Sequence, residues 1–262
     1  MKKKKILTIL IYMTNIIILA AGKGTRMKSE TPKVLNLVSG KPIIHHLLDS
    51  VSKSKIIKKP IIIVSPENQE QIKKGLKNYP YSFIVQKQQL GTGHAVASVF
   101  ENNIKLKENL MVLYGDHPCY SSSTLQKLNK KHQDSKSLVT MATTIVPKFQ
   151  DGFACFYGFG RIKRNSANQI IGIIEKTDTT EQEKQIKEVN PGLYVFNTQW
   201  LKQNIGKIKM NEKKKEYYLT DIIGLAVKQG AKINSLAVPP EECFGINTLE
   251  DLRHAENMVK RT

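Results

Sequence analysis

The sequence has 262 residues, with 41 lysines and arginines against 22 aspartates and glutamates, for a formal net charge of +19. Its length suits one large α/β domain or two small ones, and a hydrophobic fraction of 40% argues against a disordered chain or a fibrous repeat. Cys119, Cys155 and Cys243 lie far apart, which argues against a disulfide framework or a structural zinc site. Only five of the basic residues are arginines and the lysines are scattered, so we expect a solvated surface and no nucleic-acid partner.

The N-terminal residues allow two interpretations. Met1–Lys5 followed by Ile6–Met13 resembles a short secretory signal, but Thr14 interrupts an apolar run that is too short to cross a bilayer. Met13 precedes the strand-like run Ile16–Leu19 and is a plausible translation start. We therefore expect residues 1–13 to be a dispensable extension of a cytoplasmic protein without membrane contact.

Apolar runs alternate with amphipathic stretches in the first half of the chain, which predicts a mostly parallel sheet flanked by helices. The strands are expected at Ile16–Ala20, Ile61–Val64, Ser82–Val85, Leu110–Tyr114 and Ser137–Thr144. The helices are expected near Pro42–Ser54, Glu67–Lys77, Gly93–Asn102 and Ser122–Asp134. The expected fold class is therefore α/β.

The pattern changes after Pro147 to short strands, which predicts a smaller β-rich part beside the main sheet. The expected strands are Gly158–Lys163, Ile170–Glu175 and Gly192–Asn197, with a polar segment at Thr177–Glu188. The last elements are a helix at Leu219–Gln229, a strand at Lys232–Val238 and a helix at Leu249–Arg261. We expect one domain over residues 14–247, followed by a C-terminal helical arm at 248–262.

A glycine loop directly follows the first predicted strand, with the sequence Leu19-Ala20-Ala21-Gly22-Lys23-Gly24-Thr25-Arg26-Met27. Glycines let successive backbone N–H groups converge on an anion, and Arg26 and Lys33 add charges that can meet a polyphosphate. Pro42 after Gly40-Lys41 excludes a Walker A motif, and the loop lacks the third glycine of a dinucleotide fingerprint. The pattern predicts a phosphate-binding loop.

A second candidate position follows the strand that ends at Tyr114, where Gly115 and Asp116 come next. In open α/β sheets ligands bind beyond the carboxyl ends of the strands, and a carboxylate there can hold Mg²⁺. His45, His46 and His94 have no metal-ligand spacing, so we interpret them as structural.

These motifs together resemble those of the sugar-nucleotide pyrophosphorylases, and in particular the uridylyltransferase domain of the bacterial bifunctional N-acetylglucosamine-1-phosphate enzymes. The resemblance rests on the glycine loop with Pro32-Lys33 and on four further segments that follow in the expected order: Gln86–Ala95, Leu113–Asp116, Gly158–Ile162 and Glu216–Asp221. It covers residues 16 to 255.

The resemblance implies a Rossmann-like nucleotidyltransferase domain and roles for individual residues. Arg26, Lys33 and Asp116 would be catalytic, and Asp116 and Asn247 would hold Mg²⁺. The substrate-binding positions implied are Leu19, Ala20, Ala21, Gly22, Lys33, Gln86, Gly91, Thr92, Tyr114, Gly115, Asp116, Gly160, Glu175, Asn190 and Asn247. Gln86, Gly91 and Thr92 would hold uracil, and Gly160, Glu175 and Asn190 would hold the sugar.

The resemblance also implies a reaction: UTP and N-acetylglucosamine 1-phosphate give UDP-N-acetylglucosamine and pyrophosphate, with Mg²⁺ as cofactor and cell-wall precursor supply as role. The sequence departs from the family at Pro191, where a threonine is usual, and at His117–Cys119, where apolar residues are usual. It also stops before the family's acetyltransferase domain, so we expect no acetyltransferase activity and a monomer or weak homo-oligomer.

Four alternatives stay open. The same chemistry on glucose 1-phosphate with UTP or dTTP is nearest, and Pro191 leaves the sugar undecided. A cytidylyltransferase shares the glycine loop but not Glu216–Asp221. A non-catalytic sensor of a nucleotide sugar, or a nucleic-acid binder with salt-sensitive affinity, would each belong to another functional class.

Overall fold

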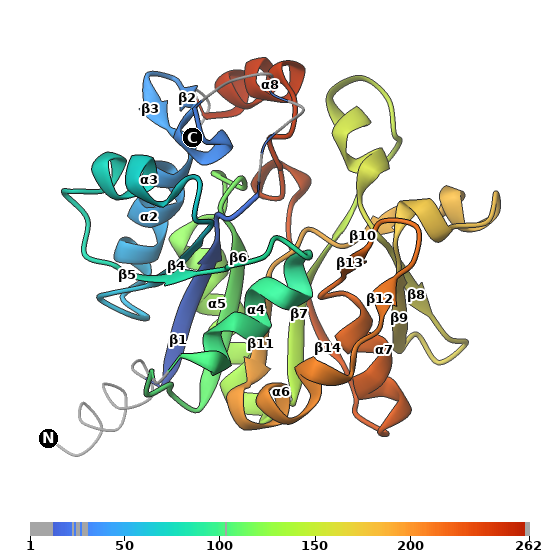
Figure 1. Cartoon of the computed structure of the whole chain (residues 1–262). Coiled ribbons are helices and arrows are strands. Elements are labelled where there is room, and N and C mark those ends of the chain that lie inside the picture. Colours follow the sequence, from blue (N-terminus) through green and yellow to red (C-terminus); the bar gives the residue numbers. More distant parts are fainter. Residues whose placement is uncertain (1–12, 23, 25–26, 28–30, 103, 260–262) are drawn as a thin grey trace, which may run out of the picture.

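The computed structural model describes residues 13–22, 24, 27, 31–102 and 104–259. A ten-stranded mixed sheet runs through the described chain, in the order β5-β4-β1-β6-β11-β7-β10-β8-β9, with β14 also pairing with β7 (Figure 1). Its first four strands are parallel: β5 Ser82–Val85, β4 Ile61–Val64, β1 Thr14–Leu19 and β6 Asn109–Tyr114. Buried parallel strands read as continuous apolar runs, as β4 does.

The second half of the sheet is mixed, because β11 Tyr194–Asn197 pairs antiparallel with both β6 and β7 Val139–Ile145. β14 Asn234–Ala237 lies parallel to β7. The end of β7 also pairs with the antiparallel set β10 Glu188–Val189, β8 Arg161–Arg164 and β9 Ile170–Ile174. This set contains two of the three strands that the sequence predicts for the β-rich part, as β8 and β9. The third, predicted at Gly192–Asn197, was wrongly assigned to that part: it is β11, whose apolar residues are buried at the centre of the main sheet between β6 and β7.

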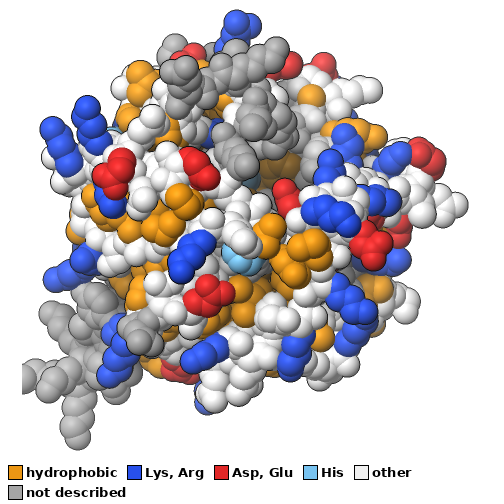
Figure 2. Space-filling view, viewed as in Figure 1, with side chains coloured by type: hydrophobic (Ala, Val, Ile, Leu, Met, Phe, Trp, Pro, Cys, Tyr) orange, Lys and Arg blue, Asp and Glu red, His pale blue; other side chains and the backbone are white. Residues whose placement is uncertain are grey.

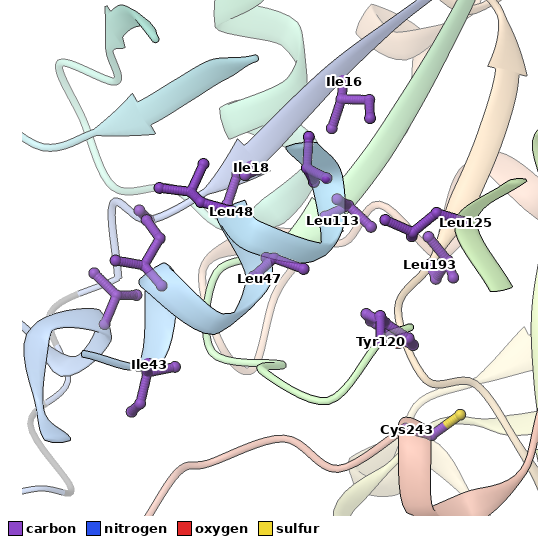
Figure 3. Close-up of a cluster of buried hydrophobic side chains, with 14 of the residues drawn as sticks. Ile16, Ile18, Ile43, Leu47, Leu48, Leu113, Tyr120, Leu125, Leu193 and Cys243 are labelled. Carbon is purple, nitrogen blue, oxygen red and sulfur yellow. The ribbon is translucent and has the colours of Figure 1, made fainter. Parts of the chain in front are cut away.

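Helices cover both faces of the sheet and enclose two apolar cores. Alternation along β1 sends Ile16 and Ile18 into one core and Ile17 into the other. The first core contains α2 Ile43–Ser54, α3 Gln69–Gly75 and α5 Ser122–Ser135, and Figure 3 shows part of it. The second contains α4 Thr92–Glu101, α6 Thr198–Asn204 and α7 Asp221–Lys228. This architecture confirms the predicted Rossmann-like fold class.

Four features were missing from the sequence-based prediction. The short hairpins β2–β3 (Leu37–Val38 and Lys41–Pro42) and β12–β13 (Met210–Asn211 and Glu216–Tyr217) have strands of two residues each, too short for a period to be read. Helix α6 has seven residues and begins directly after β11, where the Asn197 side chain caps it. The segment Asp151–Gly158 is a 3-10 helix, so β8 begins at Arg161 and not at Gly158.

The C-terminal helix α8 spans Leu249–Val259 and packs on the first core through Ala255. No helix in the described part of the chain is long and apolar enough to cross a membrane. On the face shown in Figure 2, lysine and arginine side chains are dispersed, with acidic side chains between them, and form no continuous stripe.

Candidate active site

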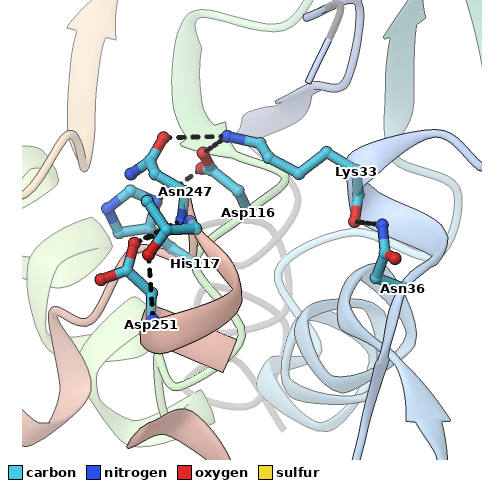
Figure 4. A network of polar contacts seen from close by, with 7 residues as sticks. Lys33, Asn36, Asp116, His117, Asn247 and Asp251 are labelled. Carbon is cyan, nitrogen blue, oxygen red and sulfur yellow. Dashed lines mark hydrogen bonds and ion pairs between the residues drawn. The ribbon is translucent and has the colours of Figure 1, made fainter. Parts of the chain in front are cut away.

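Three residues from distant parts of the chain meet beyond the carboxyl end of β6. The Lys33 ammonium forms an ion pair with Asp116 Oδ2 and donates to Asn247 Oδ1 at 3.1 Å (Figure 4). Only 15% of each of the Lys33 and Asp116 side chains is exposed. Two oxygens therefore converge on one cationic nitrogen, at the sheet edge where ligands of open α/β folds bind.

Local structure explains how each of these residues reaches the site. The Gly115 N–H donates to Leu19 O at 2.9 Å, and a Cβ on Gly115 would lie 2.9 Å from that oxygen. Only glycine lets the turn after β6 pass so close to the end of β1, and Asp116 follows this turn. On the third segment, Asp251 Oδ2 accepts from the Asn247 N–H at 2.9 Å, which fixes the start of α8.

The charges of the site favour an ionised Asp116. Burial would raise the pKa of this carboxyl, but the Lys33 ammonium and His117 beside it outweigh burial and hold the pKa well below its usual range. Asp116 is therefore a carboxylate at neutral pH, and Lys33 compensates its charge.

The predicted phosphate loop begins directly beside this cluster. Ala20 and Ala21 are buried, whereas Gly22 is exposed. Gly24 has a positive φ of 62°, and a Cβ there would lie 2.9 Å from Lys33 Cβ. The loop backbone therefore passes close to the lysine of the ion pair. Arg26, predicted to be catalytic, lies outside the described residues.

The positions predicted to hold a base form a second group. Gln86 is 3% exposed, and its Nε2 donates to Gly91 O at 3.1 Å and to His94 Nδ1 at 3.0 Å. Gly91 has a φ of 95°, and a Cβ there would lie 2.7 Å from Tyr217 O, so a residue with a side chain does not fit at this position. Thr92 Oγ1 accepts from the Leu219 N–H at 3.0 Å. The Gln86 amino group thus has two hydrogen-bond partners within the described part of the chain.

The positions predicted to hold a sugar lie together at the boundary with the β-rich part. Glu175 Oε1 accepts from Thr220 Oγ1 at 2.7 Å, and a Cβ on Gly160 would lie 3.6 Å from the same oxygen. The Asn190 N–H donates to Gly160 O at 2.9 Å, and Asn190 Nδ2 donates to the Tyr194 hydroxyl at 2.6 Å. Burial raises the pKa of Glu175, and the Thr220 bond opposes this rise.

The Asn190-Pro191-Gly192 segment, where the sequence departs from the family, packs against Tyr114. A Cβ on Gly192, whose φ is 78°, would lie 2.6 Å from the Tyr114 ring. Pro191 O accepts from the Tyr120 hydroxyl at 2.6 Å, so the proline carbonyl is tied to the core. Burial raises the pKa of Tyr114, which keeps its phenol protonated beside Glu175.

Sequence reasoning missed three residues that contact the site. His117 bonds to Asp116, Thr220 bonds to Glu175, and Asp251 fixes Asn247. The Thr248-x-x-Asp251 spacing is a capping pattern from which Asp251 could have been found. Thr220 lies within Glu216–Asp221, a segment recognised as a motif without a role for its threonine.

The oxygens of Asp116 and Asn247 fit a hard cation. Both already converge on the Lys33 ammonium, and carboxylate and amide oxygens are ligands that Mg²⁺ accepts. Among the described residues there is no cluster of three or more His, Cys, Asp or Glu side chains of metal-site geometry. Such a two-oxygen site requires substrate phosphates and water to complete the coordination of Mg²⁺.

Comparisons with solved structures show the same fold. UDP-glucose pyrophosphorylase complexed with UDP-glucose aligns with a TM-score of 0.73 at 19% identity, over 95% of this chain and 99% of that one. CMP:2-keto-3-deoxy-manno-octonic acid synthetase complexed with CTP aligns with a TM-score of 0.69 at 15% identity, over 95% and 98%.

Sequence comparisons give more similar relatives. The bifunctional protein GlmU of Clostridium kluyveri is 40% identical over 93% of this chain and 52% of its own length. Those of Clostridium tetani and Alkaliphilus metalliredigens are 36% and 37% identical over 94% of this chain and 52% of theirs. The chain thus spans about half the length of these relatives. Residues 15–239 match the family described as Nucleotidyl transferase, and the chain belongs to that family.

Proposed function

We propose that the protein is a uridylyltransferase that converts UTP and N-acetylglucosamine 1-phosphate into UDP-N-acetylglucosamine and pyrophosphate. The observation that carries the proposal is the meeting of Lys33, Asp116 and Asn247 beyond the parallel strands. The family to which the chain belongs, and the similarity of the chain to three proteins named GlmU, support a nucleotidyl transfer at this place.

The transfer needs no general base from the protein. A phosphate oxygen of the sugar phosphate forms a bond to the α-phosphorus of UTP, while the bond from that phosphorus to the bridging oxygen breaks and pyrophosphate leaves. Because a phosphate monoester is already ionised at neutral pH, no proton has to move. Catalysis is then positioning and charge stabilisation.

Lys33 is the described residue best placed to stabilise this charge. Its ammonium already lies beside Asp116 and Asn247, and phosphate oxygens arriving there would share it. Arg26 would support the pyrophosphate end of the loop, as the family resemblance implies. Leu19 to Gly22 would face the nucleotide with their backbone, opposite Gln86.

Asp116 and Asn247 would hold Mg²⁺, which would neutralise phosphate charge in the transition state. The sugar phosphate would bind toward Glu175, with Gly160 and Asn190 beside its ring. There the pair of Glu175 and Thr220 offers hydrogen bonds to hydroxyl or amide groups. The ion pair of Asp116 with Lys33 and the hydroxyl partner of Glu175 would suit a phosphate end and a sugar end of the substrate.

A second candidate is the same transfer to glucose 1-phosphate. Pro191 favours it, because proline removes a backbone donor next to Asn190, where an N-acetyl group would otherwise find a partner. A known UDP-glucose pyrophosphorylase shares the fold, so the fold itself allows this substrate.

The test is pyrophosphate release by the purified protein over a grid of sugar 1-phosphates and nucleoside triphosphates, with Mg²⁺ and with excess EDTA. We expect one maximum, at UTP with N-acetylglucosamine 1-phosphate, and loss of the signal with EDTA. A maximum at glucose 1-phosphate would establish the second candidate. Binding of UTP without any pyrophosphate release would contradict both and indicate a sensor.

A further inference from the structure

His117 is the residue of the site that the sequence left without a role. Its Nδ1 lies 2.8 Å from Asp116 Oδ1, and the residue is only 4% exposed. A carboxylate can only accept, so Nδ1 carries the hydrogen and donates it. The two oxygens of Asp116 are thus divided: Oδ1 accepts from His117 and Oδ2 accepts from Lys33 (Figure 4).

The imidazole has little freedom to turn. Its ring stacks on Tyr120, with centroids 5.8 Å apart and an interplanar angle of 6°, and meets Tyr114 edge-on at 5.7 Å. A Cβ on Gly245 would lie 2.7 Å from Cε1 and 2.8 Å from Nε2 of His117, so this side is closed by backbone. Because the ring is fixed, the direction of its Nδ1–H bond is fixed as well.

The hydrogen bond to Asp116 is also the one polar contact of the His117 side chain within the described part of the chain. Its Nε2 is buried without a hydrogen-bond partner there. A phenylalanine would fill the same space without leaving such an atom. Packing alone therefore does not account for an imidazole at this position, whereas the bond to the carboxylate does.

We propose that His117 is a positioning residue that fixes the orientation of the Asp116 carboxylate. By holding Oδ1, it keeps Oδ2 directed toward Lys33 and Asn247, where the substrate phosphates and their divalent cation would bind. Without it, the carboxylate is free to rotate about its last torsion and to turn both oxygens toward the lysine. This inference rests on the proposed function, since it gives Asp116 its task.

Two substitutions separate the hydrogen bond from the ring. His117→Phe keeps an aromatic ring between Tyr120 and Gly245 but removes the donor. His117→Asn loses the ring, but its amide nitrogen lies near the position of Nδ1 and can donate to Asp116. Positioning predicts that the phenylalanine variant is the more damaged of the two, whereas a packing role predicts the reverse order.

For His117→Phe we expect kcat to fall by about 10–100-fold, as is typical when the partner of a metal-binding side chain is removed. The KM for UTP should change by less than about threefold, because the base contacts lie elsewhere, and His117→Asn should recover most of kcat. Melting temperatures measured for both show whether each is folded, and His117→Leu replaces the phenylalanine variant if that one does not fold.

A second readout does not depend on turnover. Water-proton relaxation in a titration with Mn²⁺ at saturating UTP reports how tightly the metal ion is held in the complex with the protein. We expect the enhancement seen with the wild type to weaken in His117→Phe and to return in His117→Asn. If the wild type forms this complex but transfers nothing to any sugar phosphate, the proposed function fails while the comparison of variants still tests His117.

Several results would overturn the inference. They are wild-type kcat and relaxation in His117→Phe, an asparagine variant that is folded but as impaired as the phenylalanine variant, and a wild type that shows no relaxation enhancement. Each would mean that the bond to Oδ1 does not govern what Asp116 binds.

Discussion

Asp116 and Glu175 are both partly buried carboxylates of the candidate site, but their surroundings differ. Asp116 lies between the Lys33 ammonium and the His117 ring, and its pKa stays low although burial would raise it. Glu175 accepts from the Thr220 hydroxyl, has no ion-pair partner among the described residues, and has a pKa raised by burial. Burial acts in the same direction on both, so the neighbouring charges decide the outcome.

This difference indicates a division of labour along the site. A carboxylate that stays ionised next to a cation can bind further cations, such as a metal ion that accompanies phosphates. A carboxylate without a cation, tied to a hydroxyl, is suited to hydrogen bonds with neutral groups such as those of a sugar. The sheet places Asp116 at the end of β6 and Glu175 at the end of β9.

Removal of the negative charge of Asp116 is expected to have the largest effect on kcat. Asp116→Asn keeps the shape of the side chain but leaves Lys33 without its counter-charge and weakens any cation site. We expect kcat to fall by about 10³-fold, which corresponds to ~4 kcal/mol of transition-state stabilisation. Steady-state pyrophosphate release measures it.

Asp49→Asn is the matched control for this experiment. Asp49 also pairs with a lysine, Lys41, but it lies on α2, away from the site. We expect its kcat to stay near that of the wild type, because this partly buried pair does not belong to the site. Equal rates in the Asp116 and Asp49 variants would refute a special role for the first carboxylate.

At the ionic end of the site, which is formed by Lys33, Asp116 and Asn247, the place of Asp116 was predictable from the sequence for a topological reason, whereas Asn247 was assigned only through the family resemblance. Continuous apolar runs marked β1, β4 and β6, and parallel strands end at the same sheet edge. Residues that directly follow a strand, such as Asp116, could therefore be assigned to that edge.

The neutral end was less predictable from the residues themselves. Thr220 reaches Glu175 from 45 positions further along the chain, through the turn before α7, and no local pattern marks such a contact. The bond between His117 and Asp116 joins neighbours in sequence, yet it depends on Tyr120 and Gly245 to orient the ring. Side-chain direction at these positions is a consequence of packing, which a single sequence does not encode locally.

His132 shows what burial does to a titratable group that has no neighbouring charge. It lies on α5, is 1% exposed and bonds to Thr140, and burial lowers its pKa to about 4. Because the unfolded chain takes up the proton more readily than the folded one, acid favours unfolding. Above pH ~6.5 His132 hardly affects the free energy of unfolding, whereas between pH 6.5 and pH 4 it lowers this free energy progressively.

We therefore expect His132 to lower the free energy of unfolding by about 2 kcal/mol between pH 7 and pH 5. Urea unfolding at the two pH values measures it, and His132→Phe should remove this part of the loss. His46→Gln, a change at a half-buried histidine on α2, serves as the control. An unchanged pH dependence in His132→Phe would show that burial alone does not shift this group.

The smallest effect is expected at the neutral end. Glu175→Gln keeps an oxygen that can accept from Thr220 but gives up the charge, and we expect the KM for the sugar phosphate to rise about tenfold, the equivalent of one hydrogen bond. The kcat should change less, because under the proposed function this end would hold the sugar, away from the reacting phosphorus. Glu181→Gln, which alters an exposed carboxylate paired with Lys184, is the control.

Thr220→Val extends this experiment to the partner of Glu175. The substitution removes the donor of the 2.7 Å bond while keeping the size of the side chain. If the bond orients the carboxylate for the sugar, the two changes act on one interaction, and the double variant should raise KM little more than either single variant. Additive effects would mean that Glu175 and Thr220 contact the sugar independently. For Glu175→Gln itself, a fall in kcat larger than the rise in KM would mean that Glu175 acts with Asp116 on the reacting phosphates, and the division drawn between the two carboxylates would be wrong.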